Sequence, residues 1–287
     1  MGAGQSLDDT SSIFELDGRD GQLFATGDSV SSQAAPFRFR GANWFGSETY
    51  GGPPSGLDKH SIGHYLDLLA GHKFNAIRLL FAHEFIENDD IVKAPQEEPL
   101  LFQTRYIDMF VILAREAAKR GMLILVACHR LTHDAWPGKG LWYDDEIGWS
   151  VDRVKRSWTK FASVLCAEWN VVAADLVNEP HGASWAKGSK DDWNLGAEDL
   201  GNHVLAQCPR WLIFVEGVGY DPGAAGPGGD DPGAGIWWGE NLIGARLAQP
   251  HLSNPLKLVY SPHVYGPSVY QQHYFDDPRF PDNMPQV

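Results

Sequence analysis

The chain has 287 residues, a length that allows one large domain with a buried core. A hydrophobic content of 43% and a charged content of 21% are ordinary for a globular protein and exclude global disorder. The formal net charge of -14 disfavours nucleic acid and anionic membranes as partners, because both need a basic face on the protein. Neutral polymers are not disfavoured, and we expect a monomer.

Residues 1–12 are small and polar, so we expect them to be disordered and to precede a single folded unit over residues 13–287. They lack the charged and apolar stretches of a secretory signal. Cys128, Cys166 and Cys208 allow one disulfide, and the sequence leaves open which pair forms it.

The elements predicted along the chain alternate between strands and helices. Residues 13–24 hold Asp-Gly turns between short apolar pieces, which predicts a hairpin that closes one end of the core. Strands are predicted over 37–43, 73–81, 122–128, 171–177, 211–216 and 256–263, and helices over 58–71 (capped by Asp58), 106–120, 151–169 and 191–207. The Gly- and Pro-rich residues 221–235 predict a loop. Strand starts recur about every 37 to 49 residues, which favours a parallel sheet.

Polar side chains lie at or near the carboxyl ends of the predicted strands. They are Asn43, Arg78, His129, Asn178, Glu179, Glu216 and His263. The carboxyl ends of parallel strands meet at one rim, where enzymes built on a (β/α)8 TIM barrel carry their chemistry. The alternative is a doubly wound sheet, but no Gly-rich phosphate turn follows any of the strands.

Two features of this rim bear on its charge. Arg78 lies inside an apolar strand, where a guanidinium is costly unless it is paired. A pair with a neighbouring helix is one interpretation, and we favour a cation aimed at a carboxylate of the site. His129 and His133 lie four residues apart, but they are disfavoured as metal ligands because they lie in a loop containing Asp134 and Pro137 and not on a helix, and three convergent ligands are needed. We expect no metal and no cofactor.

The ordered set of motifs resembles glycoside hydrolase family 5, the cellulase family, and most closely its bacterial endoglucanases. The resemblance runs from about Phe37 to the end of the chain. The motifs are Gly41-Ala-Asn-Trp-Phe-Gly46, Phe74-Asn-Ala-Ile-Arg78, Leu141-Trp-Tyr143, Asn178-Glu-Pro180, Phe214-Val-Glu-Gly217, Trp237-Trp-Gly239 and His263-Val-Tyr265. It implies a TIM barrel and a retaining endo-β-1,4-glucanase that hydrolyses β-glucan polysaccharide outside the cell.

The same resemblance implies roles for individual residues. Glu179 would be the general acid/base, and Asn178 would hold the substrate 2-hydroxyl. Arg78 and Tyr265 would orient the nucleophile, while His129 and His263 would line the site of the cleaved sugar. The aromatic residues that would bind substrate by stacking on sugar rings are Trp44, Trp142, Trp237 and Trp238.

The sequence departs from the family at the nucleophile. The retaining route needs a second carboxylate about 5–5.5 Å from the first, and the family carries it as a Glu at the end of a seventh strand. After Tyr265 the only acids are Asp276, Asp277 and Asp282. We therefore expect a C-terminally truncated barrel with about six βα units, in which Arg78 has lost its anion and the chain is unstable and hydrolytically inert.

Three alternatives remain beside the glucanase interpretation. Glu216 is a less favoured second carboxylate, since it ends the strand next to that of Glu179. A non-catalytic carbohydrate-binding remnant would keep the cleft without the nucleophile. A β-mannanase of the same family would differ only in cleft loops, which the sequence does not place.

Overall fold

The computed structural model describes residues 14–27, 34–50, 52–219 and 236–282, so the predictions for residues 1–12 and 221–235 lie outside the described chain. The elements in chain order are β1 (Glu15–Arg19), β2 (Gln22–Thr26), β3 (Ala35–Phe37), β4 (Gly41–Trp44), α1 (Ile62–Gly71), β5 (Ala76–Ala82), α2 (His83–Asn88), η1 (Pro99–Leu101), α3 (Tyr106–Ala118), β6 (Leu123–Arg130), η2 (Asp145–Ile147), α4 (Val151–Leu165), β7 (Val171–Asp175), α5 (Trp193–Gln207), β8 (Leu212–Val215), η3 (Ile243–Arg246), η4 (Pro255–Lys257), β9 (Leu258–Tyr260) and η5 (His273–Phe275).

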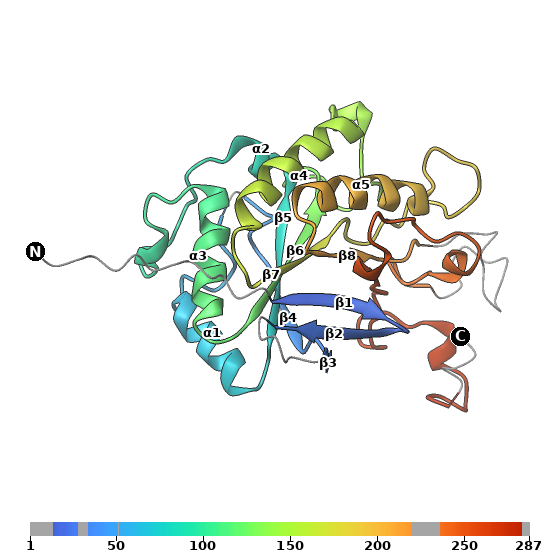
Figure 1. Cartoon of the computed structure of the whole chain (residues 1–287), viewed down its shortest axis with the longest axis horizontal. Helices are drawn as coiled ribbons and strands as arrows, with labels where there is room; N and C mark the ends of the chain where they lie inside the picture. Colours follow the sequence, from blue (N-terminus) through green and yellow to red (C-terminus); the bar gives the residue numbers. More distant parts are fainter. Residues whose placement is uncertain (1–13, 28–33, 51, 220–235, 283–287) are drawn as a thin grey trace, which may run out of the picture.

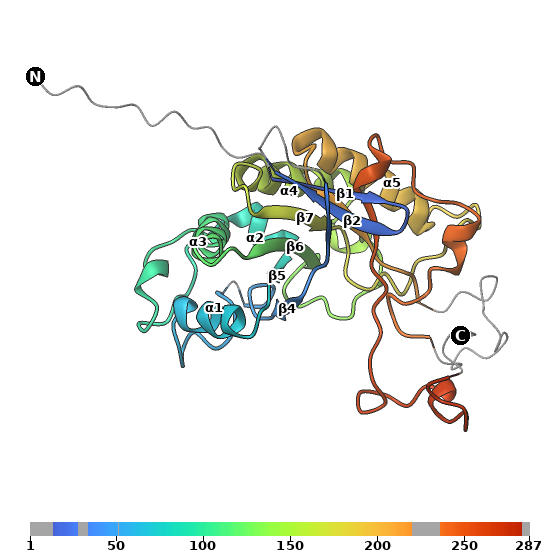
Figure 2. The same ribbon diagram turned by 60° about the horizontal axis from the view of Figure 1, so that its bottom comes forward.

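The main sheet is parallel and its strands lie side by side in chain order. The order is β4-β5-β6-β7-β8-β9, and every neighbouring pair is parallel. Helices α1, α3, α4 and α5 cover one face, and the β1–β2 hairpin crosses the other (Figure 1). The predicted α/β barrel fold is confirmed, with six parallel strands in the part of the chain that the structure describes. Beyond β9 the chain leaves the sheet (Figure 2).

Two local predictions were wrong. Residues 37–43 do not form one strand: β3 pairs antiparallel with β2, while β4 pairs parallel with β5. Between them the Arg40 N–H donates to Asn75 Oδ1 (2.7 Å), and the Asn75 N–H donates to the Arg40 carbonyl (2.9 Å). At this point the chain passes from one sheet to the other. Helix α1 is capped by Ser61, which accepts from the His64 N–H at 3.2 Å, whereas Asp58 pairs with the neighbouring Lys59.

Each face of the parallel sheet packs into a separate hydrophobic core. Residues such as Ile77, Ile124 and Val126 face the helices. Their alternating neighbours face the N-terminal β1–β3 sheet, which closes the strands' amino-terminal side with Leu16 and the partly buried Phe37. The inner layer from the main sheet comprises Ala76, Leu123, Leu125, Val172, Ala173, Leu212 and Phe214. Side chains alternate between faces along a strand, so the period-two pattern accounts for both cores except on β7, where the register with β6 shifts between Val171 and Ala173.

The same alternation positions the polar rim. Arg78 follows Ala76 on the inner face of β5, Asp175 follows Ala173 on β7, and the Glu216 that ends β8 follows Phe214. The apolar inner layer therefore fills the lower part of the sheet, and charged groups form the next layer toward the carboxyl ends.

Two further links tie distant elements together. Lys257, fully buried, donates to Glu15 Oε1 (2.7 Å), the Leu16 carbonyl (2.9 Å) and Asp17 Oδ1 (2.8 Å), which fastens β1 beside β9. Cys166 and Cys208 form a disulfide between the ends of α4 and α5, and Cys128 is free and buried. No helix among the described residues is long and apolar enough to span a bilayer.

Candidate active site

Arg78 donates hydrogen bonds to four polar side chains of the rim. Its guanidinium donates to Asp175 Oδ2 from Nε (2.8 Å) and to Glu216 Oε1 from Nη2 (3.0 Å). It also donates to the side-chain oxygens of Asn178 (3.1 Å) and Asn43 (3.3 Å). One side chain of β5 therefore joins the ends of β4, β7 and β8. The expectation that Arg78 lacks an anion was wrong, because Asp175 and Glu216 both supply one.

Glu179 leaves β7 in a left-handed backbone conformation, with φ of 49°. Such a φ costs free energy in a residue with a Cβ and persists where neighbouring contacts enforce it. Here its N–H donates to Glu216 Oε2 at 2.7 Å, and the preceding Asn178 N–H donates to the Cys128 carbonyl at 2.8 Å. These bonds turn the Glu179 side chain toward the segment that follows β9.

His263 and Tyr265 hold the Glu179 carboxylate. Nδ1 of His263 lies 3.0 Å from Glu179 Oε1, and the Tyr265 hydroxyl donates to the same oxygen at 2.6 Å. Burial opposes the charged form of Glu179, but the bonds from His263 and Tyr265 outweigh it and lower its pKa. Burial likewise disfavours charge on His263, yet its bonds to Glu179 and Glu216 dominate and raise the His263 pKa to about 10.

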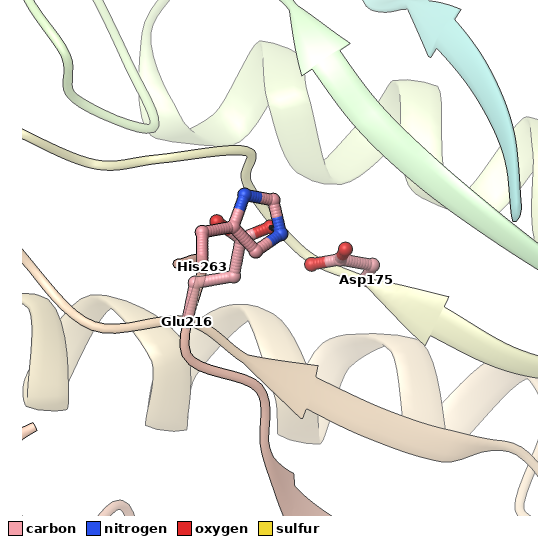
Figure 3. A group of neighbouring side chains, drawn as sticks. All are labelled: Asp175, Glu216 and His263. Atoms are coloured by element: carbon pink, nitrogen blue, oxygen red, sulfur yellow. Dashed lines mark ion pairs between the residues drawn. The ribbon is translucent and has the colours of Figure 1, made fainter. Parts of the chain in front are cut away.

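Asp175, Glu216 and His263 point toward one another and form a compact cluster (Figure 3). Burial, and then the neighbouring Asp175, raise the pKa of Glu216 to about 7. The ligand-type atoms of the three residues lie within 4.8 Å of one another, a spacing that a metal ion could use. Arg78, however, already contacts both carboxylates at 2.7 and 3.0 Å, so a cation would have to displace its guanidinium.

His129 and His133 do not act as a pair. His129, at the end of β6, stacks on Trp136 with ring centroids 4.7 Å apart, and burial together with Arg78 and Arg130 lowers its pKa to about 3. His133 instead bonds through Nδ1 to Glu84 Oε2 at 2.9 Å. His129, Trp136 and Asn178 line a small cavity of about 50 Å³ beside the rim.

The four tryptophans predicted to bind sugar differ in exposure. Trp238 is 42% exposed and stacks on His181 with centroids 3.8 Å apart. Trp142 and Trp237 are only 4% and 8% exposed. Trp142 packs on Trp193, Trp237 packs edge-on against Tyr265, and Trp44 donates to the Ser55 carbonyl at 2.9 Å. Trp238 is therefore the most exposed of the four, with one ring face covered by His181, and the sugar-binding roles of all four stay predictions.

The structure brings together most of the residues predicted for the site and adds two that sequence reasoning undervalued. Arg78 contacts Asn178, and Glu179 contacts His263 and Tyr265. Asp175 was missed and Glu216 was given only a minor part. The signal for Asp175 was available, since an acid inside an apolar strand calls for a partner as much as Arg78 does.

A parallel α/β sheet with carboxylates, an imidazole and a guanidinium at its carboxyl-terminal rim defines the class of TIM-barrel proteins with a site at that rim. The profile of the cellulase family, glycosyl hydrolase family 5, matches residues 30–287. The chain belongs to this family.

Individual relatives agree with this assignment. The chain is 35% identical over 257 residues to an endoglucanase of Paenibacillus polymyxa, covering 87% of this chain and 61% of that protein. It is 34% identical over 271 residues to the major extracellular endoglucanase of Xanthomonas campestris pv. campestris, covering 90% of this chain and 52% of that protein. The chain thus spans about half to three fifths of the length of these relatives.

A solved structure shows the same fold. An endocellulase of Pyrococcus horikoshii, described as a complex with cellotetraose, superposes with a TM-score of 0.82 and 31% identity. The match covers 96% of this chain and 76% of that one.

Proposed function

We propose that the rim of the sheet is the active site of a retaining endo-β-1,4-glucanase that hydrolyses β-glucan polysaccharide. The observation that carries the proposal is the Glu179 carboxylate, held by His263 and Tyr265 in a member of the cellulase family. The relatives named endoglucanases and the cellotetraose complex of a similar structure support a β-1,4-glucan as substrate over a mannan.

The geometry supports a role for each contact residue. Glu179 would protonate the leaving glycosidic oxygen and later take a proton from the attacking water. Arg78 binds the side-chain oxygen of Asn178, which orients the amide NH2 as a donor toward a sugar hydroxyl. Trp238, which is 42% exposed, would stack on a sugar ring of the polymer.

The second carboxylate decides whether this chain turns over substrate. Glu216 and Asp175 are 0% and 1% exposed, and both are bonded to Arg78, so neither is placed to attack a sugar. Asp276 accepts from Gln271, and Asp277 binds Arg279 within its own loop. A carbohydrate-binding protein that retains the cleft without rapid hydrolysis is therefore kept as the alternative candidate, although the relatives named endoglucanases favour the glucanase.

Cellotetraose and carboxymethyl-cellulose separate the two candidates. Calorimetry should show that wild type and Glu179→Gln both bind cellotetraose, because the substitution keeps the shape of the side chain. In a reducing-end assay, Glu179→Gln should lower hydrolysis by about 10²-fold or more, the usual contribution of a general acid. Glu84→Gln, which changes a carboxylate paired with His133, is the matched control and should retain wild-type behaviour.

Each outcome has a defined meaning. Hydrolysis that depends on Glu179 supports the glucanase, and binding without hydrolysis in wild type supports the binding protein. Equal hydrolysis by wild type and Glu179→Gln would remove the acid/base assignment, and absence of cellotetraose binding would remove both candidates. Mannan, tested in parallel, should be the poorer substrate.

We infer that the protein acts outside the cell. Support comes from the disulfide between Cys166 and Cys208, since such bonds persist in oxidising compartments, and from a relative named as an extracellular endoglucanase. Thiol titration of the unfolded natural protein, purified with alkylation during lysis, should find only the thiol of Cys128. Finding all three cysteines reduced would argue against this location.

A further inference from the structure

The carboxylate of Glu216 is fully buried, yet both of its oxygens are engaged by groups of the site. Oε2 accepts from the backbone N–H of Glu179 at 2.7 Å. Oε1 lies 3.0 Å from Nη2 of Arg78 and 3.0 Å from Nε2 of His263. Trp193 donates from Nε1 to the Glu216 carbonyl at 2.9 Å, which fixes the backbone that presents the carboxylate.

Each ring nitrogen of His263 lies close to a carboxylate. Nδ1 lies 3.0 Å from Glu179 Oε1, and Nε2 lies 3.0 Å from Glu216 Oε1. The first carboxylate is the proposed acid/base, and the second is closed off from substrate. A carboxylate on one imidazole nitrogen fixes which tautomer the ring adopts and leaves the other nitrogen to exchange protons.

We propose that Glu216 is a positioning residue that holds the Nε2–H of His263, so that Nδ1 alone exchanges a proton with Glu179. The inference rests on the proposed glucanase function and assigns the immediate proton partner of its acid. Glu216 acts through His263 and through the Glu179 backbone, and it does not touch the substrate.

The proton transfer balances within the three residues. The Nδ1–H bond of the His263 imidazolium breaks, and an O–H bond forms at Glu179 Oε1, so that the pair becomes a neutral imidazole and a neutral carboxylic acid. Nε2 keeps its proton and goes on donating to Glu216. Glu179 then gives its proton to the glycosidic oxygen, and the proton that it later takes from water returns along the same bond to Nδ1.

The charges around the cluster favour a protonated His263 beside an ionised Glu179 before the reaction. The groups that face His263 and Glu216 are Arg78 from β5, His129 from β6, Asp175 and Glu179 from β7 and the turn after it, and Tyr265 from the segment after β9. Despite burial, the two carboxylates raise the His263 pKa to about 10, while the Glu179 pKa is lowered. At neutral pH the imidazolium therefore stands beside an ionised Glu179.

Packing leaves little freedom for another arrangement. Gly239 has φ of 82°, and a Cβ there would lie 2.9 Å from Glu216 Oε2, 3.1 Å from Glu179 Cγ and 3.2 Å from His263 Cβ. The glycine lets the backbone approach the two acids and the imidazole together, so it closes the cluster from one side.

Nitrogen NMR of the full chain labelled with 15N-histidine tests the proposal. The signals of His263 among the 11 histidines are identified by their loss in His263→Asn. In wild type at pH 7 both ring nitrogens of His263 should be protonated. In Glu216→Gln the proton affinity of His263 should fall at least about tenfold, one pKa unit, and the neutral ring should no longer prefer the Nε2–H tautomer.

Controls keep the test decisive. Glu84→Gln, at the His133 pair, should leave the His263 signals unchanged. A wild-type His263 with an unprotonated nitrogen at pH 7 would overturn the proposal even if Glu216→Gln did not fold. An unchanged His263 titration in a folded Glu216→Gln would overturn it as well. The NMR measurement needs no turnover. It can therefore contradict the role of Glu216 while hydrolysis still depends on Glu179, and it can support that role even if hydrolysis does not depend on Glu179.

Discussion

Arg78 places one positive charge among groups that would otherwise repel one another. Its guanidinium contacts Asp175 and Glu216, and both carboxylates are almost fully buried. A buried ion cluster adds little net stability compared with apolar packing, but removal of one partner leaves the others uncompensated. Arg78 therefore serves the site by permitting two acids to stand beside Glu179 and His263.

Arg78→Met should lower the free energy of unfolding by about 3–5 kcal/mol at pH 8, because two buried carboxylates lose their cation. The loss should be smaller at pH 5, where Glu216, whose pKa is already raised, takes up a proton in the folded state. Urea unfolding at the two pH values measures both. Arg115→Met breaks an exposed pair with Glu168 and should change stability by less than about 0.5 kcal/mol; equal losses in the two variants would contradict this view of Arg78.

At the scale of elements, a buried lysine links the N-terminal hairpin to the segment before β9. Lys257 enters from η4, next to β9, and binds Glu15, Leu16 and Asp17 of β1. The β1–β3 sheet covers the inner apolar layer, on which the charged layer of the rim rests. The hairpin was predicted from its Asp-Gly turns, whereas its tie to the far end of the chain was not, because nothing local to either segment encodes the pairing.

Lys257→Met should loosen this hairpin and cost about 1–3 kcal/mol, because the Leu16 carbonyl and the carboxylates of Glu15 and Asp17 lose their common donor. Hydrogen exchange should accelerate first in β1 and β2, ahead of β5 and β6. Lys59→Met, at an exposed pair with Asp58, is the matched control and should leave the exchange pattern intact. Uniform acceleration of hydrogen exchange over both sheets would show that Lys257 does not stabilise the hairpin locally.

At the scale of the molecule, the sequence predicted the parallel sheet and its rim well. Five of the predicted strands contain β5 to β9 or overlap them, because apolar runs that end in polar groups report buried parallel strands directly. The prediction of one strand over 37–43 was wrong because β3 and β4 share an apolar pattern but belong to different sheets. The partners of Arg78 and the burial of Trp142 depend on contacts between distant elements, which local patterns do not carry.

The pH dependence of stability should report the protonation of His263. Burial lowers the pKa of His83 and of His129 to about 3, so the unfolded chain binds protons that the folded chain does not, and stability should fall as the pH drops from 6.5. His263 has the opposite sign: its stabilising proton is present below pH 6.5 and is lost as the pH rises toward 10.

Between pH 7 and 9 the free energy of unfolding should therefore decrease by about 1 kcal/mol per pH unit. Guanidinium unfolding at pH 7, 8 and 9 measures this slope, and His263→Asn should flatten it. A slope that persists in His263→Asn would assign the titration to another group.

The crystal structure of Glu179→Gln with cellotetraose tests the central claim most directly. The sugar should lie across the rim formed by the carboxyl ends of β5 to β9, with a glycosidic oxygen within about 3 Å of the side chain at position 179 and a hydroxyl near Asn178. Cellotetraose bound away from this rim, or a residue 179 side chain that faces away from His263 and Tyr265 with sugar present, would contradict the account.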